Sequence, residues 1–262
     1  LEAENTAVQL AGREARWMAE AARMVEANGA QMIDINMGCP AKKVVTGYSG
    51  SALLKDLDHA LGLIEAVVGA VKLPVTLKTR LGWDDTILNA PELAKRAEAA
   101  GIQMITIHGR TRCQFYKGRA DWAAIARVKD AVSIPVIANG DITNLNSAKQ
   151  ALALSGADGI MVGRSVQGRP WLLSELAHEL FQAPKVARPN LKEFGQLVAE
   201  HYDSILQFYG RDLGVRVARK HLGWYMDEAG TAQALRRKIL TAATPEDVFE
   251  VLPDAMQQEQ AA

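Results

Sequence analysis

Short apolar runs rich in β-branched residues alternate with amphipathic helical stretches along the first two-thirds of the chain. This alternation predicts βα units that build a parallel sheet. Six strands are expected, at residues 7–10, 32–36, 75–79, 104–108, 136–139 and 159–162. Helical patterns lie between them, near residues 14–27, 58–71, 91–100, 122–130 and 147–154, with apolar positions spaced to pack on a sheet.

Polar residues or glycine stand at the carboxyl end of every expected strand. In an open doubly wound sheet only the switch point carries such residues, whereas in a closed barrel all strand ends surround one pocket. The α/β class and a TIM-type (β/α)8 barrel are therefore predicted, with the open sheet as the alternative. These strand-end residues are Gln9, Asn36, Lys78, His108, Asn139, Asp141, Gly163 and Arg164.

The strand count and the later part of the chain predict two domains. A closed barrel needs eight strands, so the six found here correspond to strands three to eight, and the chain, which opens on Leu1 without an initiator Met, is expected to be a fragment that lacks the first two. Beyond the sixth strand the pattern becomes wholly helical. We predict a barrel domain over residues 1–184 and a helical domain over residues 185–262.

Composition is that of an ordinary globular protein. Thirty basic residues balance thirty acidic ones, so a nucleic-acid surface must come from local clusters of Lys and Arg. No apolar stretch approaches the ~18 residues of a membrane span, and no secretory signal is present. Two cysteines are too few for a disulfide framework, which favours a cytoplasmic protein, and no metal site is expected.

Cys39 follows the second expected strand on a loop that Gly38 and Pro40 constrain. Barrel enzymes carry their catalytic groups on such loops. A thiol with a reference pKa of ~8.5 is mostly protonated at neutral pH, so it can supply a proton, or act as a nucleophile where its pKa is lowered. The alternative is a small hydrophobic residue packed in the core.

Lys78 and His108 bring nitrogen groups to the same strand ends. A lysine inside a barrel rim needs an anion, and a reduced flavin, which is negative near N1 and O2, is one such partner. A Schiff-base lysine or a surface lysine are the rival interpretations. His108 is able to donate a hydrogen bond to a phosphate or a carbonyl group, and a purely structural histidine is its alternative.

Two glycine-rich strand ends predict a phosphate site, at residues 139–141 and at Gly163 with Arg164. Loops after strands seven and eight of a barrel commonly bind phosphate through backbone N–H groups. If two strands precede Leu1, these segments are those loops. Sugar-phosphate enzymes share this feature, so it does not by itself select one cofactor.

Two basic regions are candidates for contact with nucleic acid. The loop at residues 110–119 combines Arg110 and Arg112 with aromatic residues, a mixture that can bind phosphates and stack bases. Further along, Arg216, Arg219 and Lys220 share one face of a predicted helix. A solvated charged loop and intradomain salt bridges are the respective alternatives.

Taken together, these motifs resemble the tRNA-dihydrouridine synthases, and residues 168–171 with residues 218–225 are most similar to the bacterial B-type members. The other matching segments are residues 34–44, 108–112, 139–142 and 163–164. The resemblance implies an FMN-binding barrel followed by a helical tRNA-binding domain, in a protein expected to be a monomer. The positions that match FMN contacts are Gln9, Lys78, His108, Asn139, Gly140, Asp141, Gly163 and Arg164.

The resemblance also implies a reaction. NADPH reduces the flavin, hydride passes from flavin N5 to C6 of a uridine in tRNA, and Cys39 protonates C5, with Asn36 as a uracil contact; the product is 5,6-dihydrouridine. The sequence departs from the family in lacking its N-terminal Pro-Met-Ala-Gly type motif and in carrying Cys113 where most relatives have an acidic residue. The alternatives are a dihydroorotate dehydrogenase-like flavoprotein and an inactive RNA-binding remnant.

Overall fold

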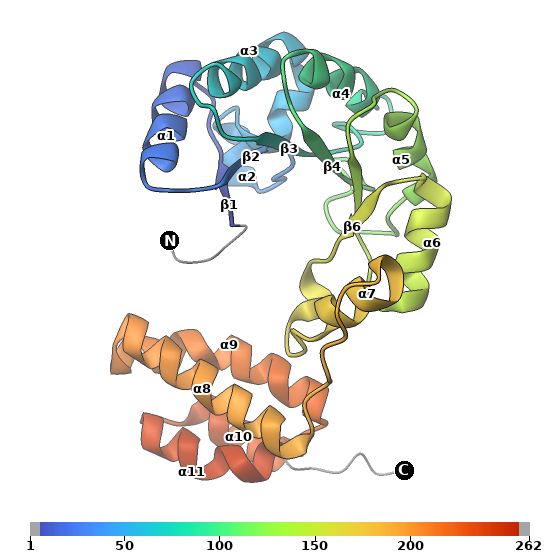
Figure 1. Cartoon of the computed structure of the whole chain (residues 1–262). Coiled ribbons are helices and arrows are strands. Elements are labelled where there is room, and N and C mark those ends of the chain that lie inside the picture. Colours follow the sequence, from blue (N-terminus) through green and yellow to red (C-terminus); the bar gives the residue numbers. More distant parts are fainter. Residues whose placement is uncertain (1–5, 257–262) are drawn as a thin grey trace. The chain divides into compact units, whose positions relative to one another are not determined.

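The computed structural model describes residues 6–256, and the chain divides into two compact units between Gly163 and Arg164 (Figure 1). The first unit contains the whole sheet, and the second is wholly helical. This order, strands first and helices afterwards, agrees with the order predicted from the sequence.

The first unit is a parallel sheet whose six strands follow one another in chain order. The strands are β1 (Ala7–Leu10), β2 (Met32–Asn36), β3 (Val75–Arg80), β4 (Met104–His108), β5 (Val136–Asn139) and β6 (Gly159–Met161). They are the six predicted strands to within one residue at each end. Consecutive parallel strands with helical crossovers are the arrangement of a TIM-type barrel, so the predicted fold class is confirmed.

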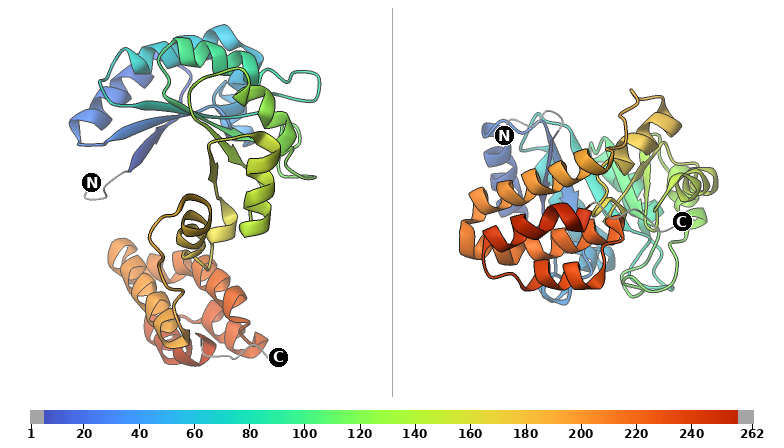
Figure 2. Two further views of the ribbon diagram at one scale, coloured as in Figure 1. Left: turned by 45° about the vertical axis from the view of Figure 1, so that its right-hand side comes forward. Right: turned by 90° about the horizontal axis from the view of Figure 1, so that it is seen from below.

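Helices cover the outer, convex side of this sheet (Figures 1 and 2). They are α1 (Ala15–Ala27), α3 (Leu57–Val68), α4 (Ala90–Ala99), α5 (Trp122–Lys129) and α6 (Leu145–Ser155). Between β2 and α3 the chain adds the short helix α2 (Lys42–Thr46) and the 3-10 helix η1 (Gly50–Lys55), which the sequence patterns did not predict.

Helix ends follow local sequence signals. The side chain of Asp56 accepts the N–H of His59 at the start of α3, and Asn144 forms a capping box with Ser147 at the start of α6. Gly156 ends α6 with a φ of 61°, a left-handed conformation that glycine adopts without a steric penalty. These signals mark the starts of α3 and α6 and the end of α6.

The two faces of the sheet differ because side chains alternate along a strand. Ile33, Ile35 and Leu77 are buried on the outer face and pack with helix residues such as Leu63 and Leu93 in one core. Polar and charged residues occupy the alternate positions, namely Asp34, Asn36, Thr76, Lys78, Arg80, Thr106, His108 and Asn139. The candidate chemistry therefore lies on the inner face of the sheet.

The second unit is a bundle with its own core (Figure 2). Its elements are η2 (Arg164–Val166), α7 (Leu172–Phe181), α8 (Leu191–Tyr209), α9 (Arg211–Ala229), α10 (Gln233–Thr241) and α11 (Pro245–Met256). The unit begins earlier than the predicted boundary at residue 184. Trp171 belongs to its core, with its ring 5.2 Å from that of Phe194, and the backbone at Gly168 lies so close to Trp224 that a Cβ would be 2.3 Å from its carbonyl oxygen.

Candidate active site

The strand register aligns the inward-facing residues of β2 to β5 in two rows. One row contains Asn36, Lys78 and Thr106, and the next contains Arg80, His108 and Asn139. Because parallel strands end at the same edge of the sheet, these rows bring the predicted site residues of four strands to one place.

The loop that carries Cys39 is held on both sides of the thiol. The Asn36 side-chain oxygen accepts the backbone N–H groups of Gly38 and Cys39, at 3.1 and 3.0 Å. On the other side, the carbonyl of Cys39 accepts the backbone N–H and the hydroxyl of Ser51, at 3.1 and 2.9 Å. Cys39 is partly exposed just beyond the end of β2, and not packed in the core.

A chain of hydrogen bonds in turn orients Asn36. Its amide donates to the side-chain oxygen of Gln9 at 2.7 Å, and the amide of Gln9 donates to Asp34 at 2.6 Å. The hydroxyl of Thr76 donates to the other oxygen of Asp34 at 2.8 Å. Three strands thus fix the amide that supports the Cys39 loop, and Gln9 acts through Asn36.

Lys78 and Arg80 place two positive charges on the inner face. Among the described residues neither forms an ion pair with a carboxylate. Burial lowers the pKa of the Lys78 ammonium, and the Arg80 cation lowers it further, while Asp34 raises it. Two desolvated cations without a paired anion form a surface that favours a negatively charged ligand.

Arg80 is a site residue that the sequence patterns did not single out. It is 2% exposed, and its guanidinium donates to the carbonyl of Gly38 at 2.8 Å and to the carbonyls of Thr111 and Phe115 at 2.9 and 2.8 Å. It also interacts electrostatically with Cys39. One side chain therefore joins the thiol loop to the loop after β4. Its position two residues after Lys78 on the same strand was the available signal.

Arg110 is buried beneath the loop after β4. Its five N–H groups are all used, by the two oxygens of Asp141 at 2.9 and 2.6 Å, the carbonyls of Lys117 and Gly118, and the ring of His108 at 3.3 Å. No donor is left for an RNA phosphate, so the predicted tRNA contact of Arg110 does not fit its position. The residue instead anchors the loop to the end of β5.

Asp141 completes this ion pair. Burial raises the pKa of its carboxyl group, but hydrogen bonds from Arg110 and from the backbone N–H of Ala120 outweigh that effect and lower the pKa below its usual value. The pairing is bidentate, the geometry in which arginine and carboxylate bind each other most strongly. Asp141 is thereby committed to holding the loop.

His108 is neutral at physiological pH. Burial lowers its pKa to about 3, with contributions from the cations Arg80, Lys78 and Arg110, and Asp141 opposes them. Next to the ring, Gly140 has a φ of 112°, and a Cβ there would lie 2.8 Å from the ring carbon Cδ2. Only glycine leaves room for the histidine at this point.

The remaining predicted cofactor positions lie at the last two strand ends. The side-chain amide of Asn139 donates to the carbonyl of Met161 at 2.8 Å, which ties β5 to β6. Gly163 ends the first unit, and Arg164 begins the second as the first residue of η2. Both residues are exposed.

The loop after β4 presents aromatic and basic side chains. The Arg112 guanidinium stacks 4.7 Å over the ring of Trp83, and Phe115 and Tyr116 are 37% and 52% exposed. Cys113 is exposed as well. Cys113, Phe115 and Tyr116 thus lie on the surface of this loop.

In the second unit, Arg216, Arg219 and Lys220 are exposed on α9, as the helical spacing predicted. Arg219 donates to the carbonyl of Ala242 at 3.3 Å. None of the three forms an ion pair with a carboxylate among residues 6–256.

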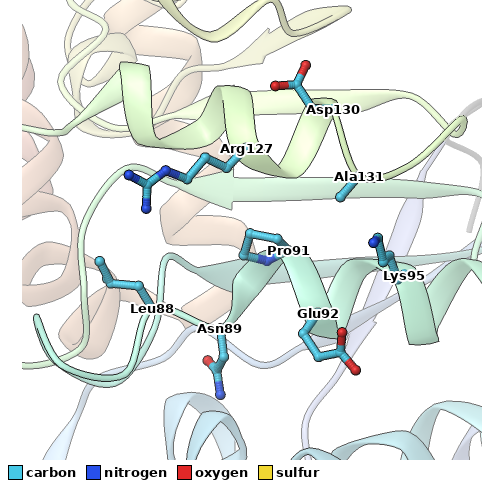
Figure 3. Close-up of a pocket in the computed structure, with 8 residues that line it drawn as sticks. All are labelled: Leu88, Asn89, Pro91, Glu92, Lys95, Arg127, Asp130 and Ala131. Carbon is cyan, nitrogen blue, oxygen red and sulfur yellow. The ribbon is translucent and has the colours of Figure 1, made fainter.

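A separate pocket of about 410 Å³ lies between α4 and α5, on the helical side of the first unit (Figure 3). Glu92 and Lys95 line it from α4, and Arg127 and Asp130 from α5 and its end. Its charges balance, and none of its lining residues belongs to the strand-end rows. No described helix is long and apolar enough to cross a membrane, and residues 6–256 contain no cluster of three or more potential metal ligands.

Comparisons with known proteins agree with this arrangement. The dihydrouridine synthase (Dus) family model matches residues 1–261. A probable tRNA-dihydrouridine synthase of Rhodobacter capsulatus is 60% identical over 257 residues, which cover 98% of this chain and 79% of that protein. A second probable tRNA-dihydrouridine synthase, from Rhizobium leguminosarum bv. phaseoli, is 56% identical over a match that covers 95% of this chain and 77% of that protein. The tRNA-dihydrouridine synthase B of Xanthomonas campestris pv. campestris is 46% identical over a match that covers 94% of this chain and 74% of that protein.

Among solved structures, the N-succinyl Arg/Lys racemase of Bacillus cereus superposes with a TM-score of 0.50 at 16% identity. The match covers 68% of this chain and 42% of the racemase, and at this identity it shows a shared fold and nothing more. The sequence matches are long and highly identical, so they confirm the resemblance of the motifs to the tRNA-dihydrouridine synthases. The chain belongs to the dihydrouridine synthase (Dus) family.

Proposed function

We propose that the protein reduces uridine to 5,6-dihydrouridine in tRNA, with a bound FMN and with NADPH as the hydride donor. The observation that carries this proposal is the Cys39 loop, which is pinned at the carboxyl end of β2 beside a cationic inner face. The relatives' names support the choice of tRNA as the substrate.

The inner face suits a flavin mononucleotide. Lys78 and Arg80 are desolvated cations without a carboxylate partner among the described residues, and a phosphate or an anionic flavin ring would neutralise them. Cations near N1 and O2 of a flavin favour its reduced state. His108, Asn139 and Gly140 lie at the neighbouring strand ends, and Gly163 and Arg164 follow the last strand. Gln9 and Asp141 complete the proposed set of cofactor residues indirectly, through the side chains of Asn36 and Arg110 that they hold.

Cys39 is the proposed proton donor. When bound, the flavin supplies the hydride that adds to C6 of the uracil ring. The thiol of Cys39 gives its proton to C5 and is left as a thiolate, which regains a proton from solvent. Hydride addition puts negative charge on a ring carbonyl, and the second amide N–H of Asn36, with Lys78, is suited to hold that charge.

The tRNA contacts are proposed to come from both units. Arg112 and the exposed rings of the loop after β4 can stack and pair with unpaired nucleotides, whereas Arg216, Arg219 and Lys220 can bind phosphates. A uridine in a tRNA loop leaves its stack at low cost, so it can reach a thiol inside the barrel mouth.

Anaerobic reoxidation tests the proposal. Protein loaded with FMN and reduced by NADPH is mixed with unmodified tRNA, and flavin absorbance and dihydrouridine content are followed. We expect reoxidation that forms one dihydrouridine for each flavin oxidised. A reduced flavin that is stable in the presence of tRNA would refute the function. Reduction of the flavin by free dihydroorotate would support the dihydroorotate dehydrogenase-like alternative, and tRNA binding without flavin uptake would support an inactive RNA-binding remnant.

A further inference from the structure

We propose that Arg110 is a positioning residue that locks the neutral ring of His108 as its Nδ1–H tautomer, so that His108 donates a hydrogen bond from Nδ1 to an acceptor oxygen of the bound cofactor. The inference rests on the proposed function for the identity of the acceptor. The tautomer itself follows from the contacts of the two side chains.

The contact between the two side chains has only one possible polarity. The Nη1 atom of Arg110 lies 3.3 Å from Nε2 of His108. A guanidinium has five N–H donors and no acceptor, so Nε2 must accept. A neutral imidazole carries one proton, and the nitrogen that accepts cannot carry it. The proton is therefore on Nδ1.

The arginine is held too firmly to release this contact. Asp141 binds it through both carboxylate oxygens, and the carbonyls of Lys117 and Gly118 accept from Nε and Nη2. Gly140 leaves the space in which the Nε2 edge of the ring approaches this assembly. The Nε2 edge is thus enclosed by residues that follow β4 and β5.

The surrounding charges keep the ring neutral. The groups that act on His108 are Arg80 and Lys78 from β3, Arg110 and Asp141, and the Tyr116 ring lies 6.5 Å away. Three of these groups are cations and one is an anion, so a protonated imidazolium is disfavoured. An acceptor placed at Nδ1 then meets a neutral N–H at any physiological pH.

Within residues 6–256 the ring of His108 forms a hydrogen bond at Nε2 and none at Nδ1. Its donor is available to a ligand on the inner face, where the cations of β3 already favour an anionic or carbonyl oxygen. The other tautomer would present a lone pair at Nδ1 and repel that oxygen. Arg110 therefore decides whether His108 attracts or repels the cofactor.

Nitrogen-15 correlation spectra of histidine-labelled protein at neutral pH test the tautomer directly, without any flavin. The five histidines are few enough to assign, and a His108→Gln spectrum identifies the signal of His108. His178 is an internal reference, because its Nδ1 lies 2.9 Å from the carbonyl of Ala183 and must donate to it. We expect His108 to show the same Nδ1–H pattern. An Nε2–H pattern, or a mixture, would overturn the proposal.

A pair of variants tests the cause. Asp141→Asn keeps the donor of Arg110, whereas the double variant Arg110→Met, Asp141→Asn removes it without leaving an unpaired carboxylate. We expect the single variant to keep the Nδ1–H pattern and the double variant to lose it. The double variant should also bind FMN about tenfold more weakly than the single variant. An unchanged tautomer in the double variant would overturn the role of Arg110. This conclusion holds even if both variants are less stable than the wild type, because the spectra report the tautomer of the folded protein.

The tautomer of His108 and the identity of the cofactor are tested by different measurements. If the wild-type protein shows the Nδ1–H tautomer but takes up no flavin, the cofactor assignment is wrong and the Arg110–His108 lock stands. If flavin binds and is reoxidised by tRNA while His108 is an Nε2–H tautomer, the lock is wrong and the proposed function stands. Arg127→Gln, which changes an exposed arginine on α5, should alter neither measurement.

Discussion

Two sets of arginines in this protein are used in opposite ways. Arg80 and Arg110, on the inner side of the first unit, are each 2% exposed and donate to three or more partners. Arg216 and Arg219, on α9 of the second unit, are exposed. The buried pair fixes the shape of the loops after β2 and β4, and the exposed pair carries solvated charge.

A basic residue beside a nucleic-acid site need not touch nucleic acid. A buried guanidinium costs much free energy to desolvate and is tolerated where its donors are satisfied, which makes it a rigid connector. An exposed guanidinium keeps its hydration and binds phosphate with a strength that depends on salt.

The largest expected effect is that of Arg80→Met. The variant leaves the carbonyls of Gly38, Thr111 and Phe115 without their charged donor, so we expect a loss of about 3 kcal/mol in the free energy of unfolding. Urea unfolding followed by circular dichroism measures it. Arg127→Gln, on the exposed side of α5, is the control and should change stability by less than about 0.5 kcal/mol. If Arg80→Met and Arg127→Gln changed the free energy of unfolding equally, the buried arginine would contribute no more to stability than the exposed one.

A second prediction concerns pH. The pKa of His108 is lowered from 6.5 to about 3 in the folded protein, so between these values the unfolded chain binds a proton that the folded protein does not. The free energy of unfolding should therefore fall as pH falls from 6.5 towards 3, by up to about 1.4 kcal/mol per pH unit for this one group.

His108→Gln should remove that part of the slope. The comparison is made between pH 6 and 4.5, where His201 and His221, whose pKa values burial also lowers, contribute equally to both proteins. Parallel stability curves for the two proteins would mean that the cations around His108 do not keep it neutral.

The smallest effect is expected on α9. Arg216→Gln should weaken tRNA binding severalfold and reduce the slope of the logarithm of affinity against the logarithm of salt concentration by about 0.7 to 0.9, the loss of one phosphate contact. Filter binding at several salt concentrations provides the slopes. Lys149→Gln, which removes an exposed cation from α6 of the first unit, should leave the slope unchanged. A slope that responds equally to both changes would argue against a specific role of α9.

The sequence predicted what depends on local pattern. Short apolar runs rich in β-branched residues located the six strands, and the position of Cys39 after a strand predicted a thiol on the loop at the strand end, where it is partly exposed. Helical spacing likewise predicted that Arg216, Arg219 and Lys220 share one face of a helix, and all three are exposed on α9.

What could not be predicted depends on contacts between distant segments. Arg110 was expected to face RNA because its neighbours are basic and aromatic, yet Asp141, 31 positions away, holds it inside. Arg80 reaches Phe115 across 35 positions. The domain boundary shifted for the same reason, since Trp171 packs on Phe194, 23 positions further along the chain, in the core of the bundle. No local pattern reports such pairings.

The Cys39 thiol is proposed to protonate the ring to which the hydride is added. Single-turnover reoxidation of NADPH-reduced protein by tRNA tests it most directly, with Cys39→Ala compared to Cys113→Ala, the exposed thiol on the loop after β4. We expect normal reduction by NADPH in both variants. The rate of reoxidation by tRNA should fall by a factor of about 10² to 10⁴ in Cys39→Ala and stay unchanged in Cys113→Ala. Reoxidation of the Cys39→Ala protein at the wild-type rate would contradict it.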